Sequence, residues 1–153
     1  MIIDKLMSPA IKTLLSTYTV STQTVGGAAG VMDTGPTGLG RNHGLAVKPY
    51  GPAWRLAGRG ATSGGAATAT LLLVTDDNAA LSSPTTLWTS PTYTLAQMVK
   101  MDNLLQLPDT DAYERYIAWR ITVGTAVFTG GSLSIEFVGD VRRWRAYPAQ
   151  GNR

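Results

Sequence analysis

Histidine is the side chain most often used for acid–base and metal chemistry near neutral pH, and the sequence contains a single one, His43. It stands between Asn42 and Gly44 in a glycine-rich stretch. No serine occurs in a Gly-x-Ser-x-Gly pattern and the chain has no cysteine, so neither a nucleophile elbow nor a thiolate or zinc cluster is indicated. We expect His43 to be a structural or solvent-exposed loop residue.

The densest group of acidic side chains consists of Asp109, Asp111 and Glu114. Two carboxylates roughly 5 to 9.5 Å apart can hydrolyse a glycosidic bond, and this spacing is compatible with such a distance. The same residues also fit a structural pattern, because Asp109 follows Pro108 in a turn and the spacing from Asp111 to Glu114 is that of a capping box. We favour the structural interpretation.

Two further motifs match ligand-binding loops only in part. Asp76, Asp77 and Asn78 offer oxygen ligands for calcium but lack the later glycine and distal glutamate of a calcium loop, and the run is typical of an Asx turn. Residues 35–40 (GPTGLG) lack the Gly-Lys-Ser/Thr ending of a phosphate loop. The sequence therefore predicts no catalytic, cofactor-binding or metal-binding residues, and we expect a protein that is not an enzyme.

The composition is that of a turn-rich β protein. The 153 residues suffice for one domain; 44% are apolar, only 15% are charged, and 20 are threonine. This excludes a coiled coil, a helical bundle and a disordered acidic chain. Residues 1–9 lack the pattern of a signal peptide, and no stretch approaches the roughly 20 apolar residues of a membrane span. We expect a soluble chain without a membrane partner.

Hydrophobic alternation predicts where the strands lie. In residues 115–123 and again in 132–138, apolar side chains occupy every second position, which is the period of a half-buried strand. Because the segment between them is rich in turn formers, the two are predicted to form an antiparallel hairpin. Shorter strands are predicted at 18–25, 45–47, 53–57, 66–75, 85–89 and 103–107, and one helical turn at 95–100.

Short strands separated by turn signals predict an all-β fold, a jelly-roll-like β-sandwich or barrel. We expect one domain over residues 1–141. Within it, the glycine-rich residues 26–44 are predicted to form a long loop or arm, since loops of that length in compact domains are usually functional or mobile. Residues 142–153 extend beyond it as a basic, aromatic C-terminal tail.

Two of these segments carry a family resemblance. Residues 73–87 (LVTDDNAALSSPTTL) and 115–131 (RYIAWRITVGTAVFTGG) resemble the capsid cement proteins of short-tailed bacteriophages of the Bordetella-phage type, as does the opening MIID. The resemblance implies a jelly-roll protein that binds the outside of an icosahedral head and stabilises contacts between major capsid protein subunits. It further implies a homo-oligomer, a dimer or trimer, that is made in the host cytoplasm and ends on the outer surface of the virion.

The positive charge of the chain is concentrated near its C-terminal end. The formal net charge is +3, but residues 142–153 hold four arginines and no acid, so the body is close to neutral. A body without a basic face argues against nucleic acid as a partner. Because Arg, Trp and Tyr are enriched at binding hot spots, the candidate partner-binding residues are those of the tail together with one arginine of the glycine-rich arm: Arg142, Arg143, Trp144, Arg145, Tyr147 and Arg41.

An alternative function rests on the tryptophans. Exposed Trp54, Trp88 and Trp144 would stack on sugar rings, which would make the chain a virion-associated jelly-roll module that binds carbohydrate or a receptor. The alternation around them favours a place in the core instead.

The tail hypothesis predicts the effect of a truncation. Deleting residues 142–153 should leave the melting temperature nearly unchanged and weaken binding to phage heads, since the tail would supply contacts and not core. Binding of the full chain should also weaken as salt rises, because exposed ion pairs are screened. Equal decoration of heads by the full and truncated chains, measured by co-sedimentation, would refute the hypothesis.

Overall fold

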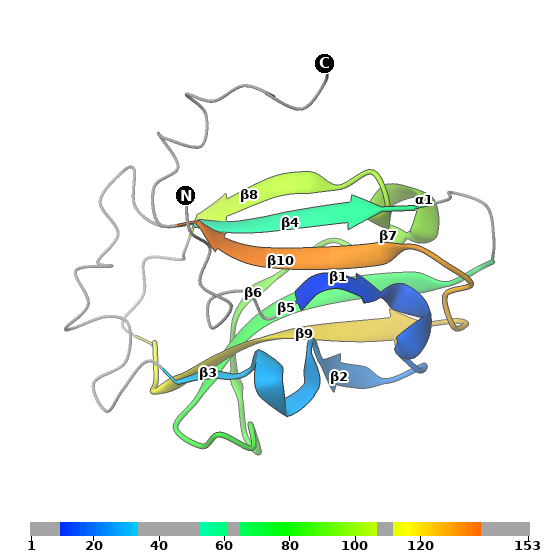
Figure 1. Ribbon diagram of the computed structural model, residues 1–153. Helices are drawn as coiled ribbons and strands as arrows, with labels where there is room; N and C mark the ends of the chain where they lie inside the picture. The colour runs from blue at the N-terminus through cyan, green and yellow to red at the C-terminus, as the bar shows by residue number, and fades with distance from the viewer. Residues whose placement is uncertain (1–9, 34–52, 61–64, 107–111, 139–153) are drawn as a thin grey trace.

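The computed structural model describes residues 10–33, 53–60, 65–106 and 112–138, which form two antiparallel sheets packed face to face (Figure 1). The first sheet has four strands in the order β1-β10-β4-β8. The second has the order β2-β9-β5-β6, with two short strands beside them. The strands of the first sheet are β1 (Ala10–Leu14), β4 (Ala53–Arg59), β8 (Asp102–Gln106) and β10 (Ser132–Val138). Those of the second are β2 (Thr22–Thr24), β3 (Met32–Asp33), β5 (Thr68–Asp76), β6 (Thr85–Thr89), β7 (Tyr93–Thr94) and β9 (Tyr116–Gly124).

The two short strands lengthen existing edges of the second sheet. β2 pairs with β9 from Thr22 to Thr24, and β3 pairs with the beginning of the same strand, so both lie along one side of β9. On the other side of the sheet, β6 and β7 succeed one another along β5 in the same manner. The second sheet is therefore four strands wide, like the first.

The longer strands pair in a nested order. β1 pairs with β10, β2 with β9, β4 with β8 and β5 with β6, so the chain behaves like one long hairpin wound into two sheets. The all-β sandwich predicted from the sequence is confirmed, and the nested order is compatible with its jelly-roll form. Within the described ranges the helices are few and short: the 3-10 helices η2 (Leu15–Thr17) and η3 (Gly27–Gly30) and the α-helix α1 (Leu95–Met98).

Most strand predictions agree with the structure to within a few residues. β9 and β10 lie where the alternation placed them, and α1 is the helical turn expected at 95–100. The predicted antiparallel hairpin between them is wrong, because β9 pairs with β2 and β5 in the second sheet and β10 with β1 and β4 in the first. The connection between them crosses from one sheet to the other. The strand predicted at 18–25 is wrong in length, since only Thr22–Thr24 pairs, and β1, β3 and β7 were not predicted. The glycine-rich arm was placed too early, because η3 and β3 occupy its first residues. The predicted strand at 45–47 and the rest of the arm, including His43, lie outside the described residues.

A row of aromatic rings fills the centre between the sheets. Trp54 on β4 and Trp119 on β9 are both fully buried, and their rings meet edge to face with centroids 5.8 Å apart. Phe137 lies 5.1 Å from Trp54, and Trp88 lies 5.7 Å from Trp119. Edge-to-face contacts of this kind add about 0.5–1.5 kcal/mol each beyond burial. The row thus links three strands of the core to the edge strand β6.

The end of the first sheet is set by a close approach between β4 and α1. A Cβ atom built on Gly58 would lie 1.6 Å from the carbonyl oxygen of Met98, which is backbone and cannot turn aside. The amide of Gly58 also donates to the carbonyl of Met101 at 2.8 Å. Only glycine allows both the strand and the helix to remain where they are.

This geometry predicts an asymmetry between two glycines. Gly58→Ala should destabilise the fold by about 1–3 kcal/mol, the usual cost of overpacking, because β4 and α1 must move apart. In a domain of this size, that corresponds to a melting temperature lower by about 2–10 °C. Gly130→Ala is the matched control, since a Cβ atom there meets nothing within 4 Å. Differential scanning calorimetry measures the melting temperatures of both variants. Equal melting temperatures would contradict the proposed contact.

Candidate contact surfaces

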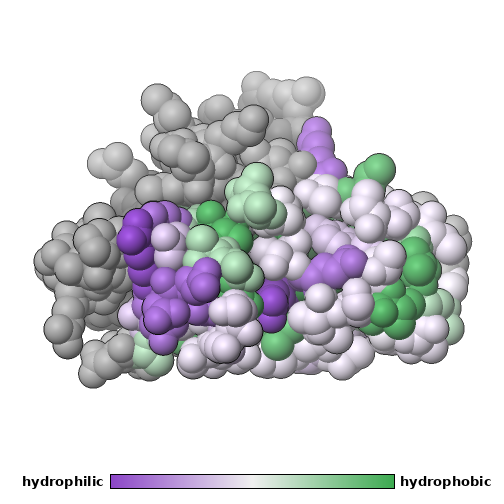
Figure 2. Space-filling model, turned by 90° about the horizontal axis from the view of Figure 1, so that it is seen from below, coloured by the Kyte–Doolittle hydropathy of each residue, from purple (hydrophilic) through white to green (hydrophobic). Residues whose placement is uncertain are grey.

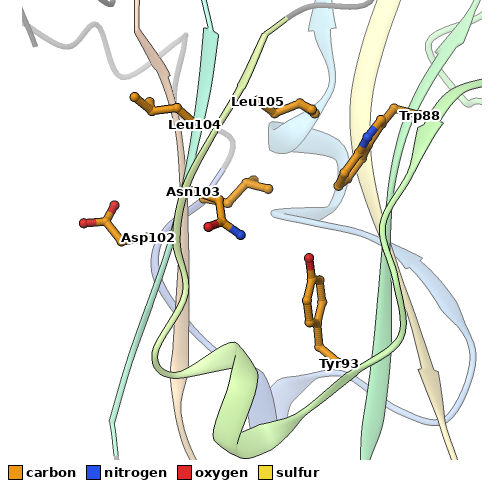
Figure 3. A pocket seen from close by; sticks show the side chains of 7 residues that line it. Trp88, Tyr93, Asp102, Asn103, Leu104 and Leu105 are labelled. Atoms are coloured by element: carbon orange, nitrogen blue, oxygen red, sulfur yellow. The ribbon is translucent and has the colours of Figure 1, made fainter. Parts of the chain in front are cut away.

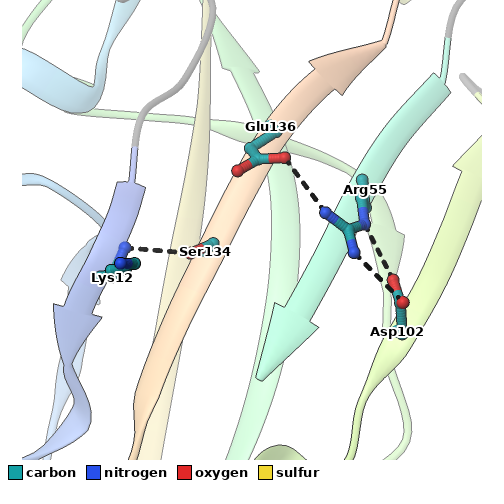
Figure 4. A network of polar contacts seen from close by, with 5 residues as sticks. All are labelled: Lys12, Arg55, Asp102, Ser134 and Glu136. Atoms are coloured by element: carbon teal, nitrogen blue, oxygen red, sulfur yellow. Dashed lines mark hydrogen bonds and ion pairs between the residues drawn. The ribbon is translucent and has the colours of Figure 1, made fainter. Parts of the chain in front are cut away.

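The outer face of the first sheet carries a network of ion pairs (Figure 4). Arg55 on β4 binds the carboxylate of Asp102 on β8 through two nitrogens, at 2.9 and 3.2 Å, and reaches Glu136 on β10 at 3.5 Å. The hydrogen bond to Asp102 raises the pKa of Arg55 further above its usual value, so the arginine remains charged. The network ties three strands together across the face, because one guanidinium on β4 holds a carboxylate from each neighbouring strand.

A shallow hollow of about 350 Å³ adjoins this network. Lys12 and Arg59 line it together with Ser134, whose hydroxyl accepts a hydrogen bond from the amide of Lys12 at 2.9 Å. Lys12 has a φ of 49° at a point where the pairing of β1 with β10 shifts register, as in a β-bulge. The bulge brings a second cation beside Arg59 on an otherwise paired surface.

The outer face of the second sheet is covered by hydroxyl groups. The hydroxyls of Thr22 and Thr122 lie 2.8 Å apart, and those of Thr70 and Thr92 lie 3.2 Å apart. Thr122 and Thr70 are register partners, so the four threonines form one row across the strands. This threonine row offers uncharged hydrogen-bonding groups. Arg120, two residues before Thr122 on the same face, donates to the carbonyl of Leu81 at 3.4 Å.

The loop after β5 covers the other part of this face. Leu81, only 3% exposed, packs on Val74 and Ala118 from outside the sandwich. The loop is held by Asp76, whose two carboxylate oxygens accept hydrogen bonds from the amides of Asn78 at 3.0 Å and Ser83 at 2.9 Å. The predicted Asx turn is confirmed. Both carboxylate oxygens of Asp76 therefore hold the backbone of the loop.

An apolar end is the third surface feature. Three large hydrophobic side chains of the described chain are exposed: Leu14 (57%), Val20 (52%) and Val127 (44%). Each belongs to a connection at the same end of the sandwich, because β1 ends at Leu14, Val20 precedes β2, and Val127 comes after β9. In Figure 2, which faces the side of β2 and β3, an apolar patch lies at one end and strongly hydrophilic residues gather toward the other. We call these three residues the apolar end.

The open edge of the sandwich forms a hollow between the two sheets (Figure 3). It has a volume of about 430 Å³ and lies where the edge strands β6 and β8 face each other. Trp88 and Tyr93 come from the second sheet, and Asn103 and Leu105 from the first. The sequence indicates Trp88 as a candidate stacking residue, but it gives no comparable signal for Tyr93 or Asn103.

The residues proposed from sequence as partner-binding are not placed by this structure. Arg41 and the tail residues Arg142, Arg143, Trp144, Arg145 and Tyr147 all lie outside the described ranges. Of the acidic group, Glu114 is described, and its amide donates to the hydroxyl of Thr75 at 2.9 Å, while Asp109 and Asp111 lie outside. Trp54 is fully buried, so the hypothesis that it stacks on a sugar is wrong.

No family model matches the chain, and no curated protein matches its sequence. Among the described residues, no cluster of three or more His, Cys, Asp or Glu side chains is arranged to hold a metal ion. The helices of the described part are all too short to cross a membrane. The surfaces themselves are therefore the basis for assigning a function.

Asp76 provides a pH-dependent test of the loop that covers the second sheet. The amides of Asn78 and Ser83 lower the pKa of Asp76, so its contribution to stability is complete above the unfolded value of about 4 and is lost as the pH falls through the lower folded value. We expect Asp76→Asn to lower the melting temperature at pH 7 and the difference from wild type to shrink below pH 4. Glu114→Gln removes a carboxylate without these amide contacts and should change the melting temperature little at either pH. A difference that persists unchanged at pH 2 would contradict this role.

Proposed function

We propose that the protein is a bacteriophage capsid cement protein, which binds the outside of an icosahedral head and stabilises contacts between major capsid protein subunits. The observation that supports the proposal most is the combination of the apolar end with the uncharged threonine row beside it. Exposed large hydrophobic side chains gathered in one place mark protein contact sites. The resemblance of residues 73–87 and 115–131 to cement proteins points to the same function.

The build of the domain suits such a task. A protein that holds neighbouring subunits together needs a rigid body with more than one contact surface. Here the paired strands of both sheets and the aromatic row supply rigidity. The apolar end and the threonine row face different directions, so each can contact a different partner. Interface cores are depleted in Asp, Glu and Lys, in agreement with the low charge content of 15%.

Copy number makes weak contacts sufficient. A protein arrayed on a shell gains avidity when each copy also touches its neighbours or a second copy of itself. We propose that the protein self-associates as a dimer or trimer through its β body, which would also cover edge strands that otherwise invite unspecific pairing.

The proposal predicts that the apolar end is needed for decoration. Val20→Asp and Val127→Asp should each weaken binding to heads assembled without the protein by about tenfold or more, because a charge would be buried against the capsid. Both residues are exposed, so the melting temperature of the free protein should stay within about 2 °C of wild type. Wild-type protein should raise the temperature at which heads release DNA, and the variants should not.

The matched control is Ala79→Asp, an exposed position in the loop after β5, at the opposite end of the second sheet. Binding is measured by co-sedimentation with heads, and self-association by light scattering against the chain mass of 16.2 kDa. Heads that are neither bound nor stabilised by wild-type protein would overturn the proposed function. Decoration that is equally strong for all variants would overturn the role of the apolar end alone.

A further inference from the structure

The hollow at the open edge of the sandwich is lined by residues whose register directs them inward. Trp88 pairs with Leu73, Tyr93 with Ala69, and Asn103 with Leu56. All three partners are buried core residues with at most 2% exposure. Neighbours across a ladder share one face of the sheet, so Trp88, Tyr93 and Asn103 also face the space between the sheets.

These three side chains nevertheless remain accessible. Trp88 and Tyr93 are half-buried and Asn103 is exposed, because the described chain places nothing beyond β6 and β8 at this edge. An inward-facing position of a sandwich is normally occupied by an apolar residue, whereas position 103 has the side-chain amide of Asn103. A departure from the hydrophobic pattern that costs packing is expected at functional positions.

The hollow is held rigid by contacts outside it. The ring of Trp88 rests edge to face against the buried ring of Trp119. Next to Asn103, the carboxylate of Asp102 is fixed by the two bonds to Arg55. Tyr93 precedes α1, whose first turn is closed by a capping box in which the side-chain oxygen of Gln97 accepts from the amide of Thr94 at 2.8 Å. A site built this way loses little conformational entropy when it binds a ligand.

The polar groups in the hollow are available to a ligand. Within the described chain, neither the hydroxyl of Tyr93 nor the side-chain amide of Asn103 makes a hydrogen bond. Figure 3 shows both groups directed toward the same space as the Trp88 ring. Tyr93 and Asn103 also line a neighbouring hollow of about 410 Å³ with Gln97 and Lys100. The two hollows therefore meet at these two residues, and each has the volume of a small-molecule site.

Aromatic faces beside amide and hydroxyl groups are the chemistry that recognises a sugar ring, whose C–H face is apolar and whose edge carries hydroxyls. We propose that this groove binds a neutral oligosaccharide, with one ring against Trp88 and Tyr93 and the next ring in the neighbouring hollow. Asn103 hydrogen-bonds to hydroxyls of both rings. Asp102 is ion-paired with Arg55, so the carboxylate in the first hollow is not an unpaired charge that would select a charged ligand. This site is separate from the apolar end and does not depend on the proposed capsid function.

The test measures binding of cellohexaose, maltohexaose and hexa-N-acetylchitohexaose to the full chain by isothermal titration calorimetry. We expect at least one of them to bind with a Kd between micromolar and millimolar. Tyr93→Phe removes only a hydroxyl and Asn103→Ala only an amide, and each should weaken that binding about two- to tenfold, as expected for one lost hydrogen bond. The control is Gln106→Ala, an exposed residue of the same strand outside the groove, which should leave the Kd within about twofold.

Three results would overturn the proposal. The first is no heat of binding for any of the three sugars at 10 mM, about ten times the weakest expected Kd. The second is binding that Tyr93→Phe and Asn103→Ala leave unchanged, which would place the sugar elsewhere. The third is binding of a capped, alternating Thr-Val heptapeptide in place of the sugars, which would show that the groove takes an added strand along β8. Melting temperatures of all variants are measured alongside, so that a lost site is distinguished from a lost fold.

Discussion

The edge-to-face contact of Trp54 with Trp119 is the interaction on which the rest of the molecule depends. Each ring comes from a different sheet, and each is completely buried, so their contact sets the spacing and the relative position of the two layers. Phe137 and Trp88 extend the same row toward the neighbouring strands. The indole N–H groups of Trp54 and Trp119 have no hydrogen-bond partner in the described chain, a cost of about 1–3 kcal/mol each that burial of such large rings must outweigh.

The two edges of the sandwich differ because the chain takes a different route after each edge strand. After β1, the chain turns through η2 and sends Leu15 and Tyr18 into the core, where burial raises the pKa of the Tyr18 hydroxyl and keeps it neutral. After β6, the chain instead returns along β5 as β7 and enters α1, which leaves Trp88 and Tyr93 half-covered. The groove is thus a consequence of the route of the chain, and the aromatic row provides its rigid wall.

Local sequence patterns predicted those strands in which apolar and polar residues alternate. The alternation in β9 and β10 results from burial of one face, and that can be read from the sequence. β3 and β7, of two residues each, exist only because β9 and β5 offer free edges, which no local pattern reveals. Asn103 could be assigned to a strand, but its place opposite Leu56 and beside Tyr93 depends on register between distant segments. The sandwich was therefore predictable, whereas the groove was not.

The distribution of charge separates two kinds of binding. On the described surface, Arg55 forms ion pairs with both Asp102 and Glu136, and Arg115 pairs with Asp33 at 2.8 Å. The threonine row and the apolar end carry no charge, so contacts made by them depend little on ionic strength. The positive excess of the chain lies in residues 142–153. If the tail takes part in decoration, the part of the binding free energy that depends on salt should come from the tail, and the part that does not should come from the sandwich. A salt titration of the full and truncated chains then separates the two contributions without any substitution in the fold.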